Sequence, residues 1–279
     1  MTEFRFQLLG PVRAWRDGAA IDVGSPQQQA VLVSLLLARG EQISMASMID
    51  ALWADRPPRS AMGVVRTYVS RLRHAFGAED PAHGLGIEFA GDGYALPRAG
   101  LVVDLDTFER RVWGAVAAAP EDPDRARTLS RSALEMWRGT PLAGVAGPYA
   151  EAVRFRTVEL RVDAAEIEFA AQVETGGHLA AIAGIRVLIN DFPLRESLHE
   201  LLMLALSRAG RPGTALEAYE SARRVLRDEL GIEPGPGLRR MQQQVLTADT
   251  RLIPDAAARP QPRSARPRIP NARLPLPGC

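Results

Sequence analysis

Residues 60–77 carry an apolar pattern with the period of an α-helix. Ser60 is a candidate N-cap, and Gly77 is the residue type that often ends a helix in the left-handed conformation. Five apolar side chains fall on one face of this helix: Ala61, Val65, Val69, Leu72 and Phe76. The pattern predicts a single helix with one buried face and one solvent-facing side.

The solvent-facing side of this helix is basic and contains no acidic residue. It holds Gly63, Arg66, Thr67, Ser70 and His74, with Arg71 and Arg73 at its margins. Solvated helices usually mix both signs of charge, whereas Arg, Thr and Ser together suit phosphate oxygens and guanine edges. Taken alone, the stretch fits a nucleic-acid-binding helix and an ordinary amphipathic helix equally well.

The chain before this helix carries strand signals and then helix signals. Residues 4–24 contain three short alternating runs, and Asp17-Gly18 supplies a turn between the last two. Two capped helices are predicted next. The first begins at Ser25, Pro26 and the capping-box residue Gln28 and runs to Gly40. The second spans 45–53 and is capped by Ser44.

A proline pair and a glycine-rich turn complete the N-terminal pattern. Pro57-Pro58 cannot continue a helix, so a loop precedes the basic helix. Residues 86–97 predict two strands joined around Gly91-Asp92-Gly93, which is a β-hairpin. This order of strands, two helices, loop, basic helix and hairpin is that of a winged helix-turn-helix, whose last helix enters the major groove of DNA while the hairpin lies on the adjacent backbone.

From residue 103 onward the pattern is entirely helical. Asp104 is a candidate cap for the first of these helices. Similar residues recur weakly at a spacing of 34 positions, as Gly176 and Gly210 illustrate, and this is the tetratricopeptide period. The predicted helices span 104–117, 122–138, 148–175, 178–190, 194–209, 212–230 and 236–247.

Longer motifs carry a family resemblance. IDALWADRPP, RTYVSRLR and GYAL are similar to the OmpR-type DNA-binding domain and, more narrowly, to the SARP family, the Streptomyces antibiotic regulatory proteins. LEMWRGTPLAG, FPLRESLHELLMLALSRAGR and ALEAYESARRVLRDELGIEPGPGL resemble the bacterial transcriptional activator domain that follows the winged helix in that family. Two residues depart from the pattern: Gly63 weakens the reading helix by about 1 kcal/mol relative to Ala, and Asp92 at the wing tip is expected to repel phosphate.

Composition narrows the chemistry. The net charge is +1, so a nucleic-acid contact must come from a local basic patch. The only cysteine is Cys279, and the four histidines lack metal-ligand spacing, so we expect no disulfide, metal or cofactor. No nucleophile motif or phosphate loop supports an enzyme. Because no signal peptide or membrane-spanning run is visible, we expect a cytoplasmic, nucleoid-associated protein.

We therefore predict a mainly α fold with a small β component. Residues 1–98 are expected to form a winged-helix DNA-binding domain, and residues 99–253 an all-α, tetratricopeptide-like activator domain. Residues 254–279 contain many Pro and Arg residues without apolar periodicity, which predicts a disordered tail.

The predicted function is sequence-specific binding of double-stranded promoter DNA. The expected DNA-contacting residues are Arg56, Arg59, Arg66, Thr67, Ser70, Arg71, Arg73 and His74. Arg66 and Thr67 are expected to read bases, and Arg71 and Arg73 to contact phosphates.

The family resemblance makes this expectation more specific. It implies an activator of a secondary-metabolite gene cluster that binds direct repeats near the promoter −35 region, as a homodimer or as tandem protomers, and recruits RNA polymerase. Two alternatives stay open: a DNA-binding repressor, and a tetratricopeptide-like interaction module whose winged helix does not bind DNA.

Overall fold

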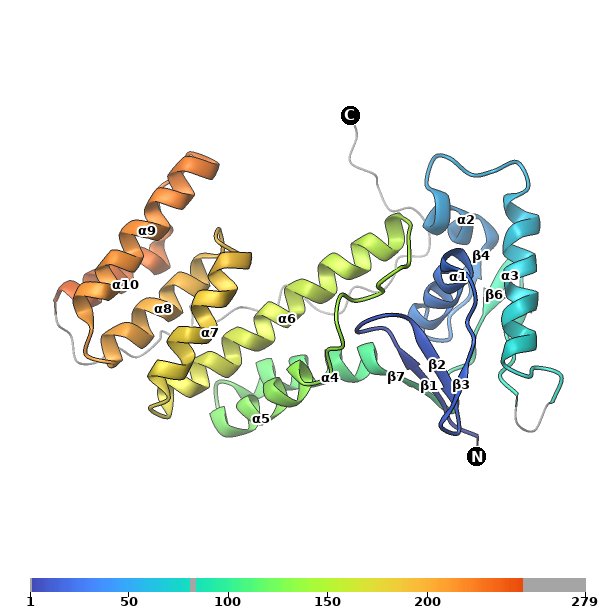
Figure 1. The fold of residues 1–279 in the computed structure, drawn as a ribbon, viewed down its shortest axis with the longest axis horizontal. Helices are drawn as coiled ribbons and strands as arrows, with labels where there is room; N and C mark the ends of the chain where they lie inside the picture. Colours follow the sequence, from blue (N-terminus) through green and yellow to red (C-terminus); the bar gives the residue numbers. More distant parts are fainter. Residues whose placement is uncertain (1, 81–83, 248–279) are drawn as a thin grey trace. The chain divides into compact units, whose positions relative to one another are not determined.

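The computed structural model describes residues 2–80 and 84–247 (Figure 1). These residues fall into two compact units. The first takes residues up to Glu109 together with Met136–Glu159, and the second takes Arg110–Glu135 and the residues from Leu160 onward. Helices α4 (Asp104–Ala118) and α6 (Pro148–Glu174) each contribute residues to both units. The predicted tail, 254–279, lies outside the described residues.

Two small sheets and three helices make up most of the first unit. One sheet has the order β3-β2-β1-β7, and the other has the order β4-β6-β5. The strands are β1 (Phe4–Gln7), β2 (Arg13–Arg16), β3 (Ala19–Ile21), β4 (Ile43–Ser44), β5 (Glu88–Ala90), β6 (Gly93–Ala95) and β7 (Leu101–Val103). The helices are α1 (Pro26–Leu37), α2 (Met45–Trp53) and α3 (Ala61–Ala75). The order of elements is that of the predicted winged helix.

The core of the first unit joins the N-terminal sheet to α3. Phe76 follows the last residue of α3 and is fully buried. The rings of Phe4 and Phe6 on β1 meet the ring of Phe76 edge-on, at centroid distances of 6.1 and 5.8 Å. Aromatic edge-to-face pairs of this kind add specific geometry to the hydrophobic burial. The end of α3 is therefore held against the sheet, and its opposite side faces solvent.

Most of the predicted helix ends are present. Ser25 and Ser44 cap α1 and α2, because their hydroxyls accept hydrogen bonds from the Gln28 and Ser47 amides at 3.4 and 3.1 Å. Gly77 has a φ of 64°, which is the left-handed conformation expected of it. The prediction for Ser60 is wrong in one respect: it occupies the N-cap position of α3, but its side chain makes no capping hydrogen bond.

Asp104 has a different role from the predicted cap. It is the first residue of α4, and its carboxylate accepts hydrogen bonds from the Leu8 and Leu9 amides at 2.7 and 3.1 Å. Burial raises the pKa of Asp104, although these two amide hydrogen bonds act in the opposite direction. The side chain thus connects the end of β1 to the start of α4, a contact between residues that are 96 positions apart in the chain.

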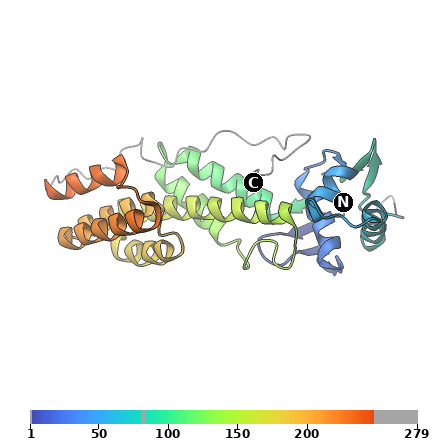
Figure 2. The same cartoon turned by 90° about the horizontal axis from the view of Figure 1, so that it is seen from above.

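The second unit is helical. It contains α5 (Pro123–Leu134), α7 (His178–Asp191), α8 (Glu196–Arg208), α9 (Pro212–Leu230) and α10 (Pro236–Leu246). These bounds agree closely with the predicted ranges, except that α5 ends at Leu134 and does not reach the predicted end at 138. Helix α8 packs against α7, α9 and α10, and these helices lie side by side in both views (Figures 1 and 2). Their shared core includes Val173, Ile185, Leu198, Met203, Ala215 and Leu226. This arrangement of stacked helical pairs is the predicted tetratricopeptide-like architecture.

One acidic group in this second unit has an unusual proton affinity. Burial, and secondarily the neighbouring Glu196 carboxylate, raise the pKa of Glu200 to about 7. Arg240 acts in the opposite direction, and Glu166 adds a smaller upward effect. The Glu200 side chain lies against Gly237, at the start of α10.

No helix among the described residues has the length and apolar content to cross a membrane.

Candidate nucleic-acid interface

The exposed side of α3 is the candidate interface. The helix buries Ala61, Val65, Val69 and Leu72, so its other side is turned outward. The midline of that outward side carries Gly63, Thr67, Ser70 and His74, all exposed, with Arg66 and Arg71 exposed on either flank. The structure therefore brings together on one surface five of the residues that the sequence predicts to contact DNA, and it adds no carboxylate from α3 itself.

The first three midline residues, Gly63, Thr67 and Ser70, have small side chains that leave room for a ligand to approach the backbone of α3. A methyl group added at Gly63 would meet no other atom within 4 Å, so the fold does not require glycine there. The hydroxyl of Thr67 donates to the carbonyl oxygen of Gly63 at 2.9 Å. Thr67 can therefore offer a ligand its methyl group and its oxygen lone pairs, while its proton is used within the helix.

The loop before α3 carries the two remaining exposed arginines of the prediction. Arg56 and Arg59 are both exposed, and they flank the proline pair in the connection between α2 and α3. This loop is short, so its side chains stay close to the N-terminus of α3. At the other end of the helix, His74 Nδ1 lies 3.8 Å from a carboxylate oxygen of Glu79, and both side chains are mostly exposed.

Arg73 differs from the other predicted DNA contacts, because its guanidinium group binds the protein itself. Its Nε and Nη2 atoms donate to the carbonyl oxygen of Ile87 at 2.8 and 2.6 Å. The same group lies 5.7 Å from the centroid of the Tyr94 ring, within cation–π range. The side chain is half-buried. Arg73 thus connects α3 to the hairpin formed by β5 and β6, which we call the wing.

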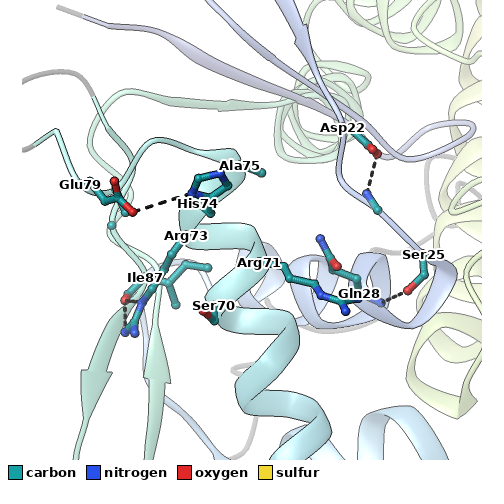
Figure 3. Close-up of a pocket in the computed structure, with 13 residues that line it drawn as sticks. Asp22, Ser25, Gln28, Ser70, Arg71, Arg73, His74, Ala75, Glu79 and Ile87 are labelled. Atoms are coloured by element: carbon teal, nitrogen blue, oxygen red, sulfur yellow. Dashed lines mark hydrogen bonds and ion pairs between the residues drawn. The ribbon is translucent and has the colours of Figure 1, made fainter.

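A cleft of about 1020 Å³ lies beside the C-terminal half of α3 (Figure 3). Figure 3 shows Arg71 extending from α3 toward Gln28 of α1. The N-terminal end of α1 forms the other side of the cleft and directs the positive end of its helix dipole there. The lining residues on that side are Asp22, Gly24, Ser25 and Gln28.

Sequence reasoning did not place the start of α1 beside α3. The two helices are connected here by a hydrogen bond from the Tyr68 hydroxyl to the Gln27 side-chain oxygen, at 2.7 Å. These residues are 41 positions apart, and no pattern in the sequence pairs them. The Asp22 carboxylate accepts a hydrogen bond from the Gly24 amide at 2.8 Å, so part of its charge is compensated locally.

The wing tip is attached to the rest of the first unit. Gln42 donates from its side-chain amide to Asp92 Oδ1 at 2.8 Å, and the Met45 amide donates to the Asp92 carbonyl oxygen at 3.1 Å. Strand β4, which carries Ile43, also pairs with β6. Asp92 therefore fixes the tip of the wing next to the start of α2. Its negative charge remains, so the expectation of a weak electrostatic contribution from the wing stays a prediction.

Comparison with known proteins identifies the family. The bacterial transcriptional activator domain matches residues 103–246. The chain is 33% identical to the transcriptional regulator RedD of Streptomyces coelicolor, over 89% of this chain and 72% of RedD. It is also 45% identical to the regulatory protein AfsR of the same organism, over 91% of this chain. The chain belongs to the SARP family of transcriptional regulators.

A solved structure supports the same assignment for the fold. Mycobacterium tuberculosis EmbR, in complex with a low-affinity phosphopeptide, is 32% identical to this SARP chain and superposes with a TM-score of 0.80, over 89% of this chain and 66% of EmbR. The predicted fold class is therefore confirmed. The chain spans about a quarter of the length of AfsR, with 25% of that protein matched. The contacts of individual side chains with DNA stay predictions.

Within residues 2–80 and 84–247, no three His, Cys, Asp or Glu side chains are grouped so that they could hold a metal ion. His199 is buried and its Nε2 lies 2.8 Å from the Pro193 carbonyl oxygen; burial lowers the pKa of this imidazole. Its position inside the helical core is that of a packing residue.

Proposed function

We propose that the first unit of this SARP regulator binds double-stranded promoter DNA, with α3 in the major groove. The observation that carries the proposal is the outward side of α3, where Arg66 and Arg71 flank a midline that holds no acidic residue and begins with small side chains. Arginine binds guanine edges and phosphates, and a narrow midline lets the helix approach the base pairs closely. Residues 1–98 would then be the functional DNA-binding domain and 99–253 the activator domain.

The proposed roles follow from where each side chain lies. Arg66 and Thr67, in the N-terminal half of α3, face outward and are assigned to base reading, with Ser70 and His74 further along the same side. Arg71 borders the cleft beside α1, which suits a phosphate of the DNA backbone. Arg56 and Arg59 are assigned to the backbone near the start of α3, and the loop that carries them is also the proposed contact with RNA polymerase.

The regulatory role is proposed from the family. RedD is named as a transcriptional regulator and AfsR as a regulatory protein of Streptomyces, and the matched family is an activator domain. We assign this chain to activation of a secondary-metabolite gene cluster, through direct repeats near the −35 region. Direct repeats place successive protomers head to tail, because a two-fold dimer would match a palindrome instead.

Selection of bound genomic fragments, followed by gel-shift titration, tests the DNA-binding proposal. We expect wild-type protein to recover one motif in tandem copies, and the double variant R66A/R71A to lose most of its affinity for that motif. Arg13→Ala is the matched control, because it removes one exposed arginine from β2, outside α3. Equal binding by the wild type and by R66A/R71A would contradict the assignment of α3. A motif located only over the −10 region or downstream would favour a repressor.

A further inference from the structure

An aromatic side chain on the wing has a large exposed surface. Phe89 on β5 is 62% exposed, and it is directly opposite Tyr94 of β6 in the hairpin register. The two rings meet edge-on with their centroids 5.4 Å apart and their planes at 73°. Tyr94 is buried, at 5% exposure. One edge of Phe89 is therefore held by a fixed neighbour, while the rest of the ring is turned to solvent.

The exposed ring lies on the side of the wing that adjoins α3. Phe89 and Tyr94 are a cross-strand pair, so their side chains share one face of the hairpin. Arg73 of α3 lies over the Tyr94 ring and binds the carbonyl oxygen of Ile87, just before β5. Since β5 is the outer strand of its sheet, Phe89 continues this row from α3 toward the outer edge of the wing. It therefore borders the surface that we assign to DNA.

The wing has no positive charge with which to hold phosphate. Residues 86–97 contain Glu88 and Asp92 but no Arg, Lys or His. A duplex lying across this hairpin can gain little from electrostatic attraction there. An exposed aromatic ring, by contrast, can pack against deoxyribose and base edges in the minor groove, where apolar side chains act as wedges in other DNA-binding proteins.

We propose that Phe89 is a DNA-contacting residue that packs against deoxyribose in the minor groove next to the major groove occupied by α3. The inference rests on the proposed function, because it takes the position of the duplex from α3. In a winged helix the hairpin meets the backbone adjacent to the reading helix. The contact is apolar, and it gives this acidic wing a role that does not depend on charge.

Salt-dependent binding of F89A and F89L separates this contact from an electrostatic one. The probe is a short duplex with a single copy of the motif that wild-type protein selects. We expect F89A to weaken binding about tenfold at every salt concentration, from the apolar area that the ring would lose. The slope of log K against log salt should stay unchanged, since no phosphate contact is removed. F89L keeps an apolar side chain and should bind within about twofold of wild type.

A matched control and a footprint make the test specific. F155A removes a phenylalanine of similar exposure, 70% exposed on α6, and should bind as wild type does. Hydroxyl-radical footprinting should show that F89A loses protection of the sugars in the minor groove beside the motif, while protection at the α3 site is retained. Thermal unfolding of F89A should match that of wild type, because most of the removed ring is exposed.

Three results would overturn the proposal. The first is equal affinity of F89A and wild type for the single motif, and the second is a reduced salt slope in F89A. The third is a loss of affinity in F89A that appears only on DNA with two motifs, which would assign Phe89 to a contact between proteins. Each leaves the proposed function intact if R66A/R71A still loses binding. If wild-type protein selects no motif, the proposed function itself fails.

Discussion

Replacing Arg73 and Arg71 separately by Ala distinguishes two roles that the sequence treats alike. Both residues lie at the margins of the basic side of α3, and the sequence predicts phosphate contacts for both. The structure separates them, because Arg71 is exposed beside the cleft while Arg73 donates two hydrogen bonds to the Ile87 carbonyl oxygen. We expect Arg71 to act on DNA and Arg73 to hold the wing.

The magnitude of each effect follows from the contact that is removed. One phosphate contact contributes about 0.9 to the magnitude of the slope of log K against log salt, so R71A should lower that magnitude by about 1. The ratio of wild-type affinity to R71A affinity should therefore be about 3.5 times larger at 50 mM than at 200 mM salt. R73A should leave the slope unchanged. Losing charge-assisted hydrogen bonds from a half-buried side chain should instead lower the free energy of unfolding by about 1–2 kcal/mol.

Two measurements check this difference. Fluorescence anisotropy with the selected duplex over a range of salt concentrations gives the slope, and urea unfolding gives the stability. R73K is the informative companion variant, because lysine keeps the charge but cannot reproduce two donors to one oxygen together with stacking on Tyr94. A slope for R73A that falls as far as that for R71A, with unchanged stability, would refute the reasoning and restore Arg73 as a phosphate contact.

Three further variants test other parts of the structure. R66A should lose about 1–3 kcal/mol of specific binding and relax the preference at one base position, as read by repeated fragment selection. Gly63→Ala should stabilise α3 by about 1 kcal/mol, since the added methyl group meets open space, yet weaken DNA binding in a gel shift. Glu200 has a pKa raised to about 7, so its folded form holds the proton more tightly than the unfolded chain does. The protonated Glu200 therefore contributes its full stabilisation below about pH 4.5, and this stabilisation is lost as the pH rises through 7. The loss in the free energy of unfolding should be about 1–2 kcal/mol after solvent screening, and urea unfolding of E200Q should not show it.

Local signals made much of the fold predictable. Ser25 and Ser44 cap helices through bonds to amides three residues away, so a few consecutive residues specify each helix start. Gly77 ends α3 because a left-handed residue is needed there. Strands β4 and β7 were not predicted because, unlike the similarly short β3, β5 and β6, they are not joined to a partner strand by a turn motif. Their pairing depends on partner strands far away in the sequence.

The candidate site was predictable only as far as helical periodicity reaches. Periodicity places Arg66 and Arg71 on the outward side of α3, and the structure agrees. It cannot tell whether an arginine at the margin meets solvent or a neighbouring hairpin, and for Arg73 the position of Ile87 decides this. The Asp92–Gln42 contact joins residues 50 positions apart, so the role of that acid could not be read from its place in a turn.

If the first unit binds DNA as proposed, its distribution of charge implies that this binding depends little on electrostatic attraction. Once Arg73 is assigned to the wing, the exposed arginines of α3 and its preceding loop are Arg56, Arg59, Arg66 and Arg71. If Arg66 reads a base, three remain for phosphates, which corresponds to a salt slope of about 3. The non-specific affinity of a single protomer for DNA would then be low. Stable occupancy of a DNA site therefore requires contributions that do not depend on salt. These are base contacts from α3, apolar packing by the wing, and binding of neighbouring protomers on tandem sites.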